Sequence, residues 1–249
     1  MKKAINIVKS IPWYGWVLSI GLFLLQYFLY LLAPIISNAL GLTPLCPKID
    51  KLDNLIPQVK IFVIPYVFSY VFWICGNLAI SITSKDNFIN YIISLVFAYL
   101  IGFLIFIFFP TYISRVDEGL YKTLGNDLLS NILKIVYDND GKEVGLNLFP
   151  SYHCLISTYC YLGIRKQKNI NKKFKIYTII MTALICLSTL FTKQHYFLDM
   201  ICGISISIFT YSIVKLINPA NKLIEKTNQE MKGTLWFTII RKTVIFKID

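Results

Sequence analysis

The chain has 249 residues, of which 56% are hydrophobic and only 15% are charged, and its mean hydropathy is +0.61. A soluble domain carries about a quarter charged residues, so this composition excludes an ordinary soluble protein. The formal net charge of +12 would suit a nucleic-acid-binding protein. Because lysines beside membrane spans set orientation, we attribute the charge to membrane topology and expect no nucleic-acid partner.

Apolar residues gather into six runs, most of them close to the roughly 20 residues that a helix needs to cross a bilayer. The predicted spans cover residues 13–32, 61–82, 88–109, 149–164, 174–191 and 195–217. The first follows a basic start and is too long for a secretory signal core, so it is predicted to be a retained anchor. No polar linker divides the chain. The pattern predicts an all-α polytopic membrane protein whose six transmembrane helices form one bundle, in a single domain over residues 1–249.

Two of the stretches outside these spans are informative. Residues 110–147 form a polar segment, and residues 218–249 alternate basic residues with apolar ones. The tail therefore indicates an amphipathic, interfacial segment on an anionic leaflet. The six cysteines show no CxxC spacing and sit mostly in apolar runs, so they are predicted to be small buried hydrophobes without a metal site or disulfides.

The charged residues predict the orientation. The linker between the fourth and fifth spans, together with the start of the fifth, holds six basic residues and no acid, whereas residues 110–147 hold four basic residues and six acids. Six spans place the basic segments on one side and the acidic segment on the other. The positive-inside rule then places both termini in the cytoplasm of a cell-membrane protein. The ends of spans three, four and six that carry polar residues would meet on the extracytoplasmic side.

The start of span six carries the most unusual polar residues, His195 and Asp199. Their i, i+4 spacing predicts one helix face. An unpaired carboxylate inside the bilayer costs roughly 2.5–3.5 kcal/mol, so Asp199 needs a partner, and the imidazole is nearest. Such a pair fixes the histidine tautomer and leaves the other nitrogen free as a nucleophile. The alternative is a pair that only fixes helix packing. Lys193 is placed to neutralise an attacked anion.

Two further elements are predicted at the same membrane face. Span four opens with Pro150, Ser151 and His153. Proline suits a first helical turn, and a serine at a helix N-terminus suits an anion. Arg115, after span three, suits bidentate phosphate recognition. Taken alone, His153 is better explained as an interfacial histidine hydrogen-bonded to a neighbour, and Arg115 alone could be a headgroup anchor. Jointly, two histidines beside a phosphate cradle favour phosphoryl transfer through a phosphohistidine, with one imidazole attacking and the other protonating the leaving oxygen.

These residues resemble the motifs of the type 2 phosphatidic acid phosphatase superfamily over residues 50–215. The family has three motifs. The first is a lysine followed, after six residues, by Arg-Pro, and the second is Pro-Ser-Gly-His. The third is Ser-Arg followed, after five residues, by His and, after three more, by Asp. Here the corresponding positions are Arg115, the run Pro150-Ser151-Tyr152-His153, and Ser188-Thr189 followed by His195 and Asp199. The spacing of the third motif, from Ser188 to Asp199, is the same as in the family.

The resemblance implies that His195 is the nucleophile, Asp199 its orienting partner and His153 the general acid. Arg115, Ser151, Tyr152 and Lys193 would bind the substrate phosphate. Four positions depart from the family: Phe108 replaces the lysine, Val116 the proline, Tyr152 the glycine and Thr189 the arginine. Such changes resemble the branch that includes the inositol phosphorylceramide synthases, and Lys193 would replace the charge of the lost arginine.

The resulting prediction is a lipid phosphate phosphatase that needs neither metal nor cofactor. Its expected substrates are phosphatidate, phosphatidylglycerophosphate or a polyprenyl diphosphate held in the bilayer. The alternative is a phosphotransferase that moves a phospho head group to a lipid or sugar alcohol at the same site. A transporter would need more intramembrane charges and repeat symmetry, which the sequence does not display.

Overall fold

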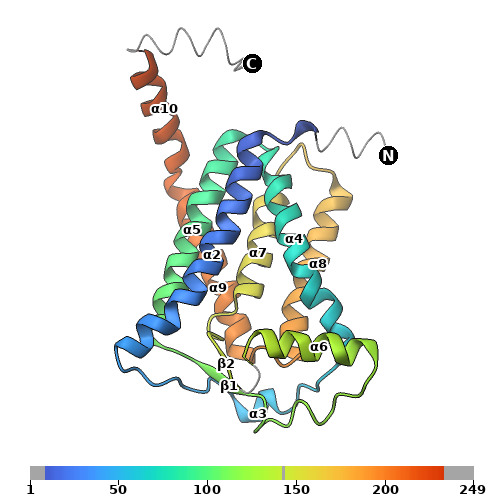
Figure 1. Cartoon of the computed structure of the whole chain (residues 1–249). Helices are drawn as coiled ribbons and strands as arrows, with labels where there is room; N and C mark the ends of the chain where they lie inside the picture. Colours follow the sequence, from blue (N-terminus) through green and yellow to red (C-terminus); the bar gives the residue numbers. More distant parts are fainter. Residues whose placement is uncertain (1–8, 142–143, 233–249) are drawn as a thin grey trace.

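The computed structural model describes residues 9–141 and 144–232 (Figure 1). It is an all-α arrangement, as predicted. The bundle consists of α2 (Trp13–Ala39), α4 (Val63–Ser81), α5 (Lys85–Phe108), α7 (Tyr152–Arg165), α8 (Lys172–Phe191) and α9 (Phe197–Ile217). Five stretches within it are long and apolar enough to cross a membrane: Trp13–Ala39, Lys60–Ser81, Lys85–Phe108, Lys172–Phe191 and Phe197–Ile217. The second of them begins with the short helix η1 (Lys60–Phe62).

The predicted fourth span is α7, and it differs from the others. It has 14 residues, about 21 Å at 1.5 Å per residue, which is shorter than the hydrocarbon layer. Most of its residues are buried among the other helices. The structure therefore supports five spans by length and composition, and the predicted count of six is not established.

Successive helices of the bundle run in opposite directions (Figure 1). One end carries α3 (Asp50–Asp53), β1 (Tyr112–Ser114), α6 (Leu128–Asn139) and β2 (Val144–Leu146). The other end carries the turn between α4 and α5, the basic linker between α7 and α8, and α10 (Pro219–Lys232). The acidic and basic segments thus lie at opposite ends, which is the separation that the charge pattern predicts.

The core surrounds α7 and contains buried tyrosines whose hydroxyl groups are satisfied. Tyr159 on α7 donates to the Ser94 carbonyl at 2.7 Å, and Tyr91 donates to Asn77 Oδ1 at 2.5 Å. A buried tyrosine needs such a partner for its polar tip. These bonds tie α4, α5 and α7 together.

Residues 110–147 were predicted only as a polar segment, but the structure gives them order. Strands β1 and β2 pair antiparallel, with Ile113 opposite Gly145. Asp127 caps α6 by accepting from the Ser130 N–H at 3.2 Å. Leu133 and Tyr137 of α6 are fully buried in a small second core. This layer covers one end of the bundle.

Of two other predictions, the one on the cysteines is wrong in part and the one on the C-terminal tail is not tested. All six cysteines are free, but Cys46 and Cys75 are exposed, so the prediction that all are buried is wrong. Cys75 lies on the outer surface of α4, where a lipid-facing helix is as apolar as a protein core. In the predicted interfacial tail, α10 begins directly after Asn218, whose φ of 49° ends α9. Residues 233–249, with the apolar positions on which that prediction depends, lie outside the described residues.

Candidate active site

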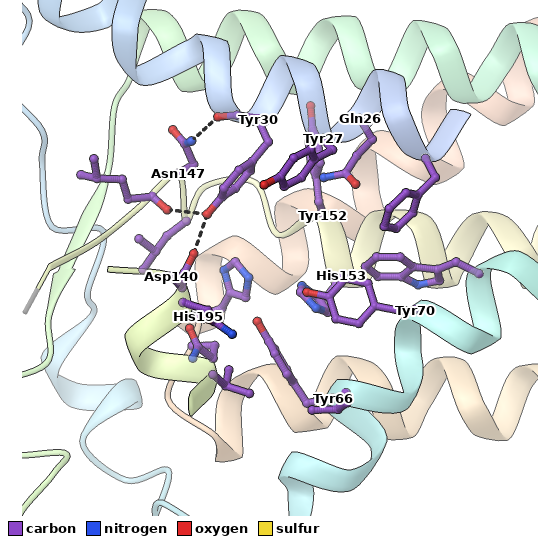
Figure 2. Close-up of a pocket in the computed structure, with 18 of the residues that line it drawn as sticks. Gln26, Tyr27, Tyr30, Tyr66, Tyr70, Asp140, Asn147, Tyr152, His153 and His195 are labelled. Atoms are coloured by element: carbon purple, nitrogen blue, oxygen red, sulfur yellow. Dashed lines mark hydrogen bonds between the residues drawn. The ribbon is translucent and has the colours of Figure 1, made fainter. Parts of the chain in front are cut away.

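A cavity of about 820 Å³ lies where the bundle meets α6, and both histidines line it (Figure 2). Its wall comes from α2, α4, α6, the β2 region and the residues at the starts of α7 and α9. Leu24 and Tyr27 of α2 and Val67 and Tyr70 of α4 line the cavity and are also exposed. The cavity therefore reaches the outer surface of the bundle between α2 and α4.

A sharp turn presents His195 to the cavity. The Thr189 carbonyl accepts the backbone N–H groups of Gln194 at 3.0 Å and His195 at 3.1 Å. Lys193 has a φ of 54°, in the left-handed region that such a turn requires. Helix α9 begins only at Phe197, so the predicted arrangement of His195 and Asp199 on one helix face is wrong.

The pair forms through the helix cap instead. Asp199 is the third residue of α9, and its Oδ2 accepts the Tyr196 N–H at 2.8 Å in a capping box. The same Oδ2 lies 3.4 Å from His195 Nδ1. Asp199 is fully buried. Burial lowers the pKa of His195, but its neighbours, led by the Asp199 carboxylate, together raise it by more, so this pKa lies above its ordinary value. With Nδ1 next to Asp199, Nε2 is the nitrogen available to a ligand.

His153 lies on the opposite side of the same space, 6.1 Å from His195 between ring centroids. Tyr66 stacks on it at 4.2 Å, and Trp73 and Tyr70 pack at 5.0 and 5.7 Å. Its Nε2 is buried and has no hydrogen-bond partner among the described residues. Buried polar atoms are almost always satisfied, so this nitrogen is available for a group that enters the cavity.

Ser151 joins the two histidine segments. It caps α7 by accepting the Cys154 N–H at 3.4 Å, and its own N–H donates to the Asp199 carbonyl at 3.0 Å. The helix starts after Ser151, so Pro150 precedes the cap and does not occupy the first turn as predicted. Ser151 is fully buried and lies outside the cavity lining. Tyr152 lines the cavity with its ring, while its hydroxyl donates to the Tyr99 carbonyl at 2.9 Å.

The two predicted cations are engaged elsewhere. Arg115 is fully buried. Its Nη2 donates to Asp140 Oδ2 at 2.6 Å and to Gln194 Oε1 at 2.9 Å, and its Nη1 donates to the Gly141 carbonyl. Lys193 donates to the Asp53 carbonyl at 2.8 Å. Neither residue lines the cavity. The phosphate-binding roles of Arg115, Lys193, Ser151 and Tyr152 remain predictions.

The comparison with protein-family models gives a match that spans these residues. The model described as PAP2 superfamily covers residues 59–213, which is more than half of the chain. The chain belongs to the PAP2 superfamily. The matched range contains both histidines, Asp199 and Arg115, and it confirms the resemblance drawn from the motifs. No curated protein and no solved structure matches the chain. Kinship with the inositol phosphorylceramide synthase branch remains a prediction.

Membership in the PAP2 superfamily supports phosphatase-type chemistry in broad terms. Two cationic positions of the PAP2 motifs carry no charge here. Phe108, in place of the lysine, is exposed at the end of α5. Thr189, in place of the arginine, is fully buried, and its hydroxyl donates to the Cys186 carbonyl at 2.8 Å. The site is therefore poorer in positive charge than the PAP2 motifs imply.

The structure also places three residues in the site that the sequence did not single out. Asp140 and Gln194 line the cavity in front of Arg115. The Tyr30 hydroxyl donates to Asp140 Oδ1 at 2.7 Å (Figure 2). The role of Gln194 could have been predicted from the sequence, because this residue directly precedes His195. Asp140 and Tyr30 are 110 residues apart in the chain, and no local pattern relates them. Among the described residues, no three His, Cys, Asp or Glu side chains gather in a way that holds a metal ion.

Proposed function

We propose that this protein is a membrane enzyme that cleaves a phosphoester of a lipid through a covalent intermediate on His195. The observation that carries the proposal is the placement of His153 and His195, 6.1 Å apart between ring centroids, in the wall of one cavity. Asp199 at 3.4 Å from His195 Nδ1 supplies the third member of a nucleophile, base and orienter arrangement.

The chemistry follows from these positions. The Nε2 lone pair of His195 attacks phosphorus and forms a P–N bond, while the P–O bond to the leaving alcohol breaks. The leaving oxygen takes its proton from His153. Water then attacks phosphorus and gives a proton to His153, the P–N bond breaks, and His195 is restored. Asp199 holds the His195 tautomer and stabilises the positive charge that develops on the ring.

A lipid substrate suits the route into the cavity. Leu24, Tyr27, Val67 and Tyr70 line its opening on α2 and α4, two helices long and apolar enough to span the membrane. A lipid tail between these helices remains in apolar surroundings while its phosphate reaches the histidines. From the charge distribution, we place this end of the molecule on the extracytoplasmic side.

The alternative function is that of a transferase, in which an alcohol accepts the phosphoryl group in place of water. The cavity also presents the amide side chains of Gln26, Asn139 and Asn147, which suit the hydroxyl groups of an alcohol. If such an alcohol replaces water in the second step, the product is a new phosphodiester. The same P–N intermediate precedes both products.

Purified protein in detergent should be tested against a panel of phosphatidate, phosphatidylglycerophosphate, a polyprenyl diphosphate and common phospholipids. His195→Ala is expected to abolish turnover, and His153→Ala to lower it by about 100-fold or more, in the range of one acid–base group. Phe209→Ala, exposed on α9, is the control and should retain activity. Chelator is expected to leave the rate unchanged. Full turnover in a folded His195→Ala protein would overturn the proposal.

A further inference from the structure

The charges around the cavity select among phosphoesters. The cavity lining, as far as the chain is described, contains no lysine or arginine and a single carboxylate, Asp140. Arg115 behind this wall already pairs with Asp140 at 2.6 Å. A phosphomonoester with two negative charges would therefore enter a space with an adjacent carboxylate and no free cation in the described wall. A buried charge without a partner is costly, so this site disfavours a dianion.

The same wall has features that suit a positive group. Four tyrosines line it, Tyr27, Tyr30, Tyr66 and Tyr70 (Figure 2). Trp73 also belongs to the lining. Aromatic faces attract ammonium groups, and quaternary ammonium ligands are commonly held in such aromatic surroundings. Asp140 adds a carboxylate beside them that is already paired with Arg115 and hydrogen-bonded to Tyr30, and its side chain remains 29% exposed after these contacts.

We propose that the cavity binds a lipid phosphodiester with a positively charged head group, and that Asp140 determines this specificity. The inference rests on the proposed function and names the substrate class for the same site. The phosphate, with one negative charge, lies between the histidines, and the ammonium group lies against Asp140 and the tyrosines. With phosphatidylcholine, His195 displaces diacylglycerol, whose oxygen takes the His153 proton, and water then releases phosphocholine.

Diacylglycerol release allows three substrates with the same acyl chains to be compared in detergent micelles. Phosphatidylcholine carries a cation and a phosphodiester, phosphatidylglycerol a phosphodiester alone, and phosphatidate a monoester. We expect kcat/KM for phosphatidylcholine to exceed both others by at least tenfold. Equal or faster turnover of phosphatidylglycerol or phosphatidate would overturn the proposal. This comparison uses only the wild-type protein and does not depend on any variant folding.

The second arm tests Asp140 itself. Asp140→Asn keeps the size and an oxygen acceptor for Arg115 but removes the charge, so the phosphatidylcholine preference should fall by tenfold or more. Asp138→Asn is the matched control, because Asp138 lies in the last turn of α6, which Asp140 caps, and accepts from the Tyr121 hydroxyl at 2.9 Å, outside the cavity lining. An unchanged preference in a folded Asp140→Asn protein would contradict the role of Asp140. Loss of all turnover in His195→Ala tests the chemistry separately, so the two failures are distinguishable.

Discussion

The backbone N–H of Ser151 donates to the backbone carbonyl of Asp199 at 3.0 Å. This hydrogen bond joins the segment that carries His153 to the segment that carries His195. Gly203 makes the approach possible, because a Cβ at that position would lie 2.4 Å from the Ser151 carbonyl oxygen and 3.3 Å from the Leu155 nitrogen. The two imidazoles share a cavity because α7 and α9 meet without a side chain between them at this point.

Gly203→Ala should therefore separate the two histidines. Overpacking of this kind costs about 1–3 kcal/mol, and a displacement near 1 Å lowers activity by roughly 100-fold. Thermal unfolding and kcat/KM of the purified variant provide the measurement. Gly21→Ala is the control, since nothing lies within 4 Å of a Cβ at Gly21. Equal activity of the two variants would argue against this account of the helix contact.

The rate should depend on pH through His195. Its pKa is raised above the ordinary value by the Asp199 carboxylate, against the lowering effect of burial. The nucleophile is the neutral ring, which predominates above this pKa, so kcat/KM should fall as the pH drops through it. Asp199→Asn removes the carboxylate and should move this acidic limb to lower pH, while reducing the maximal rate. A limb that stays in place in this variant would show that another group titrates.

Arg115 should matter for stability. It is fully buried and paired with the partly exposed Asp140 at 2.6 Å. Removal of one partner from a buried ion pair lowers the free energy of unfolding by about 3–5 kcal/mol. Because Asp140 is partly exposed, we expect a loss at the lower end of this range. Arg115→Ala should therefore lower the unfolding temperature. The double variant with Asp140→Ala should lose less than the sum of the single losses. Additive losses would contradict the pairing.

The orientation of the protein has a direct chemical test. Cys46 is exposed, lies between α2 and α3, and donates from its Sγ to the hydroxyl of Tyr196, the residue after His195 in the cavity wall. In a variant that retains Cys46 as its sole cysteine, a membrane-impermeant thiol reagent should label intact cells. Labelling only after the membrane is permeabilised would place the cavity on the cytoplasmic side.

Much of the fold was predictable because apolar runs and charge distribution reflect the bilayer directly. The limits appear at α7, a short and mostly buried helix, where the predicted fourth span is not established. Lipid tails and a protein core select the same apolar residues, so hydropathy does not distinguish them. Helix α6 was missed although Asp127 at its cap and the spacing of Leu129, Leu133 and Tyr137 were recognisable signals.

The site was predictable where its residues are close in sequence. The spacing of His195 and Asp199 indicated a pair, although a cap rather than a helix face brings them together. Arg115 was expected to face a phosphate, but Asp140, 25 residues away in the chain, holds it. Such a contact depends on how α6 and β2 fold over the bundle. That arrangement has no local signature.

The central claim is that His195 carries the phosphoryl group while His153 moves the proton. The most direct measurement is mass spectrometry of a rapidly quenched reaction, using His153→Ala so that the intermediate breaks down slowly. We predict an acid-labile, alkali-stable phosphorus adduct on the peptide that contains His195, and none in His195→Ala. An adduct on another residue, such as Ser151, or full turnover without His195, would contradict the account.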